Sequence, residues 1–344
     1  MTREKSILRA LRLIQMQYTK SWINRFKPYV RWFILALTCG FILHTLRLNW
    51  QQVITLRFTP YAIAQLITAT GITLLAHIWS GCVWGWIMQL LDAPITATWA
   101  IITYLKTNLG KYLPGNVWHF IGRVQALRAA GTQTGVAITG VVLEPVLMSV
   151  AALAIVIITL PTTVLQGVVL GAVLVCVHPR VLNPVLRRLA TTKLKQTATD
   201  LDEPPVIPTL RNYPIKPLLG EIIFVGLRGA GFLLAFGALS PINATNGWMI
   251  LGAFSFAWLL GLVVPGAPSG LGVFEATALT ILTPQFPAAT VLGAVALYRL
   301  LGTLAEVLGA GLAVLDERWN GRGRSHPAAE VSDRKRLKPS EPLS

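Results

Sequence analysis

The chain alternates between long apolar runs and short polar links. Each run extends about 20 residues, the length that an α-helix needs to cross the hydrocarbon core of a bilayer. A chain of 344 residues has room for about eight such runs with short connections. The pattern therefore predicts an all-α, polytopic membrane protein with about eight transmembrane helices. The runs that we expect to span are residues 32–48, 62–91, 136–160, 164–177, 218–239, 248–264 and 289–315.

Two stretches rich in Pro and Gly interrupt this pattern. The first lies within residues 95–131, which hold four basic residues and no acid and are too polar for an ordinary lipid-facing span. Pro114 and Gly115 are expected to form a hinge that ends one half-helix. Asn116 is expected to cap a second half-helix that runs to Ala130. We expect the non-helical backbone between the two to be buried in protein or to face a water-filled cavity.

The second interrupted stretch is residues 265–284, with the sequence PGAPSGLGVFEATALTILTP. Its hinge residues Pro268, Gly270 and Gly272 preclude a continuous helix, and Ser269 is expected to cap the helix that follows. We expect this stretch to cross the membrane obliquely, which makes the total number of crossings even.

Charged residues inside the apolar runs are the strongest candidates for a site, because an ionisable group at membrane depth is costly unless it is paired. Each half has a charge in its broken stretch and an opposite charge in the next span: Arg123 with Glu144, and Glu275 with Arg299. The hinge proline precedes the second charge by 30 residues in one half and by 31 in the other. Paired Pro/Gly breaks at matching places in two halves indicate a transporter binding site. The alternative interpretation is that the four charges only neutralise one another in buried ion pairs with a structural role.

Four further ionisable residues in these runs are interpreted individually. We interpret His77 as a packed, hydrogen-bonded helix residue rather than a ligand. Glu221 stands near the start of its run and is interpreted as an interfacial residue. Arg228 lies deeper in the same run and needs a partner. Glu306 shares the last run with Arg299.

The formal net charge of +16 raises the question of a nucleic acid partner. The basic residues, however, concentrate at the chain ends and in a central loop, residues 178–217, beside apolar segments. Anionic lipid and the positive-inside rule explain that distribution better than nucleic acid does. We therefore expect a multi-pass protein of the plasma (inner) membrane, with the basic N-terminal segment 1–31, the central loop and the charged, disordered tail 316–344 in the cytoplasm.

The three cysteines lie within apolar runs and have no CxxC spacing, so the sequence predicts neither a disulfide framework nor a metal site. It also lacks a Walker A loop, an HExxH motif and a GxSxG elbow, and we expect no cofactor.

Two motifs carry a resemblance to a known family. LPGNVWHFIGR followed by an intramembrane Glu, and PSGLGVFE followed by an Arg in the final helix, resemble the transmembrane, flippase-like domain of the lysylphosphatidylglycerol synthetase family. The likeness covers roughly residues 30–315 and implies a flippase-like transmembrane domain at 32–315 with re-entrant half-helices. In full-length synthetases a soluble aminoacyltransferase domain follows, and no such domain is recognisable here, so we do not expect lysyl transfer by this chain. The resemblance implies these residues as the conduit or headgroup site: Pro114, Gly115, Arg123, Glu144, Gly270, Gly272, Glu275 and Arg299.

The leading functional hypothesis is a translocator of a phospholipid or a polyprenyl-phosphate-linked lipid. The half-helix N-termini at Asn116 and Ser269 offer unpaired N–H groups and positive dipole ends to an anionic headgroup. Arg123 and Arg299 add positive charge suited to a phosphate. Glu144 and Glu275 are expected either to neutralise these arginines when the site is empty or to bind a cationic headgroup amine.

Two alternatives remain open. One is an intramembrane transferase acting on a lipid-linked substrate, with Glu144 or Glu275 as base and His119 as a proton carrier. The other is a scaffold that recruits envelope-synthesis enzymes, in which the buried charges are purely structural.

Overall fold

The computed structural model describes residues 59–93, 95–112, 117–159, 171–172, 175, 177–197, 208–264 and 270–320. All elements in these ranges are helices: α3 (Pro60–Leu90), α4 (Ala97–Asn108), the 3-10 helix η1 (Leu109–Tyr112), α5 (Trp118–Ala129), α6 (Thr134–Thr159), α8 (Pro179–Thr197), α9 (Ile215–Gly237), α10 (Ala244–Val263), α11 (Val273–Leu282) and α12 (Ala288–Asn320). The expected span 32–48, most of the expected span 164–177, the N-terminal segment 1–31 and nearly all of the tail lie outside the described residues.

Five helices, α3, α6, α9, α10 and α12, are long and apolar enough to cross a membrane. By this measure the chain is a multi-pass helical membrane protein. Each of the five begins and ends within five residues of a span expected from the sequence. Helix α11 has 10 residues, and at 1.5 Å per residue it extends only about half the thickness of a bilayer core. The crossing expected of residues 265–284 is therefore not made by α11 alone.

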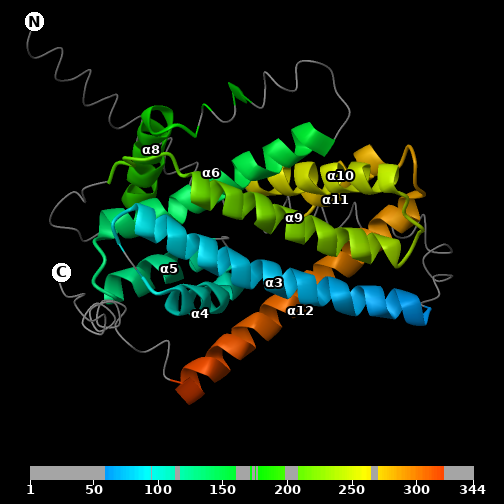
Figure 1. Cartoon of the computed structure of the whole chain (residues 1–344), viewed down its shortest axis with the longest axis horizontal. Helices are drawn as coiled ribbons and strands as arrows, with labels where there is room; N and C mark the ends of the chain where they lie inside the picture. Colours follow the sequence, from blue (N-terminus) through cyan, green and yellow to red (C-terminus); the bar gives the residue numbers. More distant parts are fainter. Residues whose placement is uncertain are drawn as a thin grey trace, which may run out of the picture.

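The long helices form a bundle whose centre is α3 packed along α9 (Figure 1). Helices α6, α10 and α11 lie on one side of this pair, and α12 crosses α3 obliquely on the other. The short helix α4 packs beside the C-terminal part of α3, and α5 packs against α4 and α6. This arrangement places the two half-helices of the first broken stretch against the interior face of the bundle.

Small residues allow α3 and α9 to pack closely. A Cβ atom added to Gly231 of α9 would lie 2.6 Å from the Thr73 hydroxyl of α3, and one added to Gly220 would lie 2.6 Å from a Val83 methyl. Ala69 and Thr73 are fully buried in the same contact. Interfaces of this kind are typical of membrane helices, where close backbone approach and dispersion replace the hydrophobic effect as the source of attraction.

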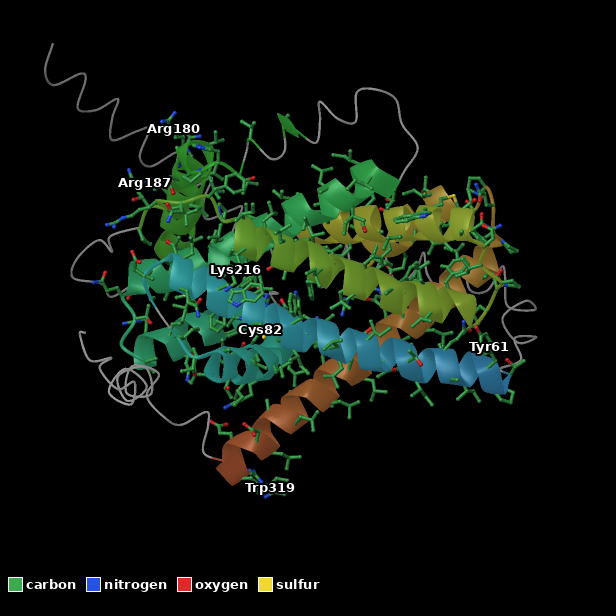
Figure 2. The ribbon with its side chains drawn as sticks, in the orientation of Figure 1. Tyr61, Cys82, Arg180, Arg187, Lys216 and Trp319 are labelled. Atoms are coloured by element: carbon green, nitrogen blue, oxygen red, sulfur yellow. The ribbon has the colours of Figure 1, made fainter. Side chains whose placement is uncertain are left out.

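The central region 178–217 contains a helix, α8, where the sequence predicted only a loop. Leu182 and Leu186 are buried against residues of α3, α6 and α9, whereas Arg180 and Arg187 are exposed and project away from the bundle (Figure 2). The helix was missed because its apolar positions are too few for a span but sufficient for one buried stripe. Figure 1 shows α8 lying across the direction of the long helices at one end of the bundle.

Candidate functional site

The first group of buried charges joins two helices of the first sequence half. Arg123 on α5 donates from Nη1 to Oε2 of Glu144 on α6, and each side chain is only 2% exposed. The pairing expected from the sequence is confirmed. Glu144 faces the interior because it lies on the side of α6 that packs against α3 and α9.

Aromatic rings hold the Arg123 guanidinium in place. Its Cζ lies 3.8 Å from the ring centroid of Tyr104 and 5.7 Å from that of Trp84. The Tyr104 hydroxyl accepts a hydrogen bond from Ser80 at 2.7 Å, and Nε of Arg123 donates to Thr107 at 3.4 Å. A planar cation fits this stack better than an ammonium group does, because both faces of the guanidinium are apolar.

Glu221 on α9 belongs to the same region. It is fully buried, and its two carboxylate oxygens have no hydrogen-bond partner among the residues that the structure describes. It interacts electrostatically with Glu144 and Arg123. The start of α9 packs against α3 and α6 and carries the Glu221 side chain into the bundle, a burial that the interpretation of Glu221 as an interfacial residue did not include. We name Arg123, Glu144 and Glu221 the Arg123 group.

A second group has Glu306 of α12 at its centre. Oε1 of Glu306 accepts from Lys111 Nζ at 2.5 Å and lies 3.1 Å from His77 Nε2. Arg228 of α9 approaches the same His77 nitrogen with Nη1 at 2.9 Å. His77 is thus packed and hydrogen-bonded, as interpreted from the sequence, and Arg228 has the partner that it needed. We name Glu306, Lys111, His77 and Arg228 the Glu306 group.

The third group joins the second broken stretch to the last helix. Arg299 of α12 pairs through Nε with Oε1 of Glu275 on α11, as the sequence predicted. Arg299 also donates from Nη2 to the Gly270 carbonyl at 3.3 Å, and the other Glu275 oxygen accepts from the Gly272 N–H at 2.7 Å. Gly270 and Gly272 have φ values of 69° and 85°, which a side chain would strain. We name Arg299 and Glu275 the Arg299 group.

Two predicted caps differ from the structure. Helix α11 starts after Gly272, whose own N–H donates to the side chain of Glu275 three residues on, so Ser269 is not at the cap position. Helix α5 starts after Val117, which supplies no side-chain cap, so Asn116 is not at the cap position, and the helix ends at Ala129. The Glu275 carboxylate in the first turn of α11 also complements the positive end of the helix dipole.

The remaining candidates are placed as follows. His119 lies on α5 one turn before Arg123; it is buried, and its ring packs at 3.8 Å between centroids from that of Phe120. Pro114, Gly115, Asn116, Pro268 and Ser269 lie outside the described residues. No cluster of three or more His, Cys, Asp or Glu residues suited to a metal occurs in the part of the chain that the structure describes.

The three groups are spaced along the bundle. Glu221 and Arg228 are seven residues apart on α9, and Arg299 and Glu306 are seven apart on α12, which in each case is about 10 Å along the helix axis. Lys111 interacts electrostatically with Arg123 on one side, and Tyr298 contacts Arg228 and interacts with Arg299 on the other. The Glu306 group therefore lies between the Arg123–Glu144 pair and the Glu275–Arg299 pair.

Comparison with known proteins adds little to this geometry. No family model matches the chain. A segment of 126 residues is 31% identical to an uncharacterized protein, slr0712, of Synechocystis, and the match covers 34% of this chain and 39% of that protein. The chain thus spans about two fifths of the length of this relative. The resemblance to the lysylphosphatidylglycerol synthetase family stays a prediction.

Proposed function

We propose that this membrane protein translocates a lipid with a phosphate-bearing headgroup, either a phospholipid or a polyprenyl-phosphate-linked lipid. The observation that supports the proposal is the row of three charged groups at about 10 Å intervals inside an otherwise apolar bundle. Each group contains an arginine: Arg123, Arg228 and Arg299. Buried charge at membrane depth is costly, and its usual role is to mark a substrate or ion pathway.

The charge balance of the Glu306 group favours an anionic ligand. Lys111 and Arg228 are positive, Glu306 is negative and His77 is counted as neutral, so the group carries an excess of one positive charge. The Lys111 side chain is 21% exposed, whereas that of Glu306 is 2% exposed. A phosphate that approaches from the Lys111 side would meet an ammonium group first and the guanidinium of Arg228 behind it.

The transferase alternative has less support in the geometry. Each of the two carboxylates proposed as a base, Glu144 and Glu275, is bonded to an arginine. A carboxylate oxygen that already accepts a hydrogen bond from a guanidinium is less available to take a proton from a substrate. The scaffold alternative predicts that replacing a buried charged residue by an uncharged one leaves function unchanged wherever stability is preserved. Lys111→Gln tests this prediction.

Lys111→Gln should slow lipid crossing without unfolding the protein. The variant loses one charge-assisted hydrogen-bond donor worth about 1.5–3 kcal/mol, which corresponds to a roughly tenfold or greater loss of affinity for a phosphate headgroup. The measurement is the initial rate at which fluorescent phosphatidylglycerol crosses liposomes containing the purified protein, followed by quenching from outside.

Lys106→Gln is the matched control for this experiment. Lys106 also pairs with a glutamate of α12, Glu317, but its side chain is 38% exposed and lies outside the three groups. We expect Lys106→Gln to retain the parent rate. Equal rates for both variants and the parent, in protein that demonstrably moves lipid, would mean that the Glu306 group does not bind the headgroup.

We also propose that the α8 end of the bundle faces the cytoplasm of a cell with a plasma (inner) membrane, together with both chain ends. The support is the basic excess of residues 178–217, seven Lys or Arg against three acids. Tyr61 and Arg180 lie at opposite ends of the bundle (Figure 2). In a variant without Cys39, Cys82 and Cys176, an impermeant thiol reagent should label Tyr61→Cys in intact cells and Arg180→Cys only after permeabilisation. The reverse pattern would invert the topology.

A further inference from the structure

Glu221 presents a charge problem that the two ion pairs do not have. Its side chain is fully buried, and neither carboxylate oxygen has a hydrogen-bond partner among the described residues. An ionised carboxylate in that position would lose its hydration without any compensating bond. A neutral carboxylic acid or a bound cation removes this difficulty.

The charges around Glu221 do not balance it. Arg123 of α5 already pairs with Glu144 of α6, and neither Glu221 oxygen bonds a cation of the described residues. Helix α4 contributes the neutral Tyr104 hydroxyl and α3 contributes Ser80, which bond each other. The Arg123 group therefore carries an excess of one negative charge.

More distant cations are engaged elsewhere. Arg228 is about 10 Å farther along α9 and bonds His77, and the charged residues of α12 that face the interior belong to the Glu306 and Arg299 groups. The ammonium of Lys216 lies 4.5 Å from the ring centroid of Trp86. Helix α10, which also packs on α9, contains no ionisable side chain.

We propose that Glu221 is a proton-binding site, and that the Arg123 group holds one exchangeable proton when no lipid is bound. One proton supplies the single positive charge that the group lacks. A proton fits better than a metal ion, because the described residues offer no cluster of three or more His, Cys, Asp or Glu side chains here.

The charge count of the Arg123 group also links proton binding to lipid transport. This link depends on the function proposed above. When a phosphate headgroup draws Arg123 away from Glu144, both carboxylates of the group are left without a cation. The group then takes up a second proton from solution, so that anion binding and proton uptake occur together. No covalent bond changes in this step; one proton moves from water to a carboxylate oxygen.

Infrared spectroscopy of the purified protein in lipid bilayers tests the proton site without any transport measurement. The parent should show a carboxylic-acid C=O band at neutral pH, and the band should disappear as the pH is raised. Glu221→Gln should remove this band, since the amide keeps the shape of the neutral acid but has no titratable proton. Glu317→Gln, in the partly exposed pair with Lys106, should leave the band unchanged.

A second variant and a salt comparison complete the experiment. Glu221→Asp should shift the frequency of the band rather than abolish it, which identifies the group even if Glu221→Gln folds poorly. A parent spectrum without a protonated carboxyl at neutral pH would overturn the proposal, as would a band that both Glu221 variants leave unchanged. Stabilisation of the parent by sodium but not by choline, lost in Glu221→Gln, would replace the proton by a metal cation. Failure of lipid transport with the band intact would instead count against the proposed function alone.

Discussion

Glu144→Gln should destabilise the protein by about 3–5 kcal/mol, the range for breaking a buried ion pair. The variant leaves the Arg123 guanidinium 2% exposed, stacked on Tyr104 and without its carboxylate. Arginine cannot relieve the imbalance by losing its proton. Glu221 can release its proposed proton and replace part of the missing charge, so we expect a loss toward the lower end of that range. Thermal unfolding of the purified protein in detergent measures the effect, with the amount of folded protein in membranes as a second readout.

Double variants show whether the loss comes from the unpaired charge. Arg123→Gln/Glu144→Gln should recover much of the stability, because both charges are gone. Glu144→Gln/Glu221→Gln should be less stable than Glu144→Gln, since it removes the remaining carboxylate that can ionise beside Arg123. Glu317→Gln breaks a partly exposed pair and should change stability by no more than about 1 kcal/mol. If Glu144→Gln behaves like Glu317→Gln, the Arg123–Glu144 pair does not carry a buried charge.

Glu306→Gln should have the second large effect, because this one carboxylate contacts Lys111 of η1 and His77 of α3, and Arg228 of α9 approaches the same His77 nitrogen. The variant leaves Lys111 and Arg228 as two positive groups around a neutral His77. We expect a loss of at least about 3 kcal/mol, most of it from Arg228, since Lys111 is nearer to solvent. His77→Gln removes no formal charge and should lose less, on the order of 1–3 kcal/mol.

An added anion distinguishes this destabilisation from a simple packing defect. The excess positive charge of the Glu306 group rises from one to two in Glu306→Gln, so inorganic phosphate or phosphatidylglycerol should raise the unfolding temperature of the variant more than that of the parent. An equal response of both proteins to the anion, or none in either, contradicts an anion site at this group.

The spans and the two ion pairs were predictable because each depends on a short-range rule. An apolar run of sufficient length crosses a bilayer, which locates α3, α6, α9, α10 and α12. A buried charge needs an opposite charge, and the order of Arg123, Glu144, Glu275 and Arg299 along the chain left few ways to pair them. The partners that form are those expected from that order.

The Glu306 group was not predictable because its four members come from η1, α3, α9 and α12. Which faces of four helices meet is set by their rotation about their own axes, and small residues such as Gly231 fix that rotation through contacts far apart in the sequence. The burial of Glu221 was not predictable for the same reason. Its distance from the end of an apolar run suggested an interface, whereas the helix carries it inward.

Helix α8 has a consequence for how the bundle can move. Helix α8 packs against α6, and its Leu182 and Leu186 belong to one buried cluster with residues from the C-terminal end of α3, from α6 and from the N-terminal part of α9. The Asn183 side chain adds two hydrogen bonds to the backbone of Leu210, at 2.8 and 3.1 Å, just before α9 begins. Three long helices are thus clamped together at one end, so rearrangements that separate them must pivot there. The largest displacements are expected at the far end, near Tyr61. The charged groups would then be exposed to solvent by the long helices moving apart at that end while they stay together at the α8 end.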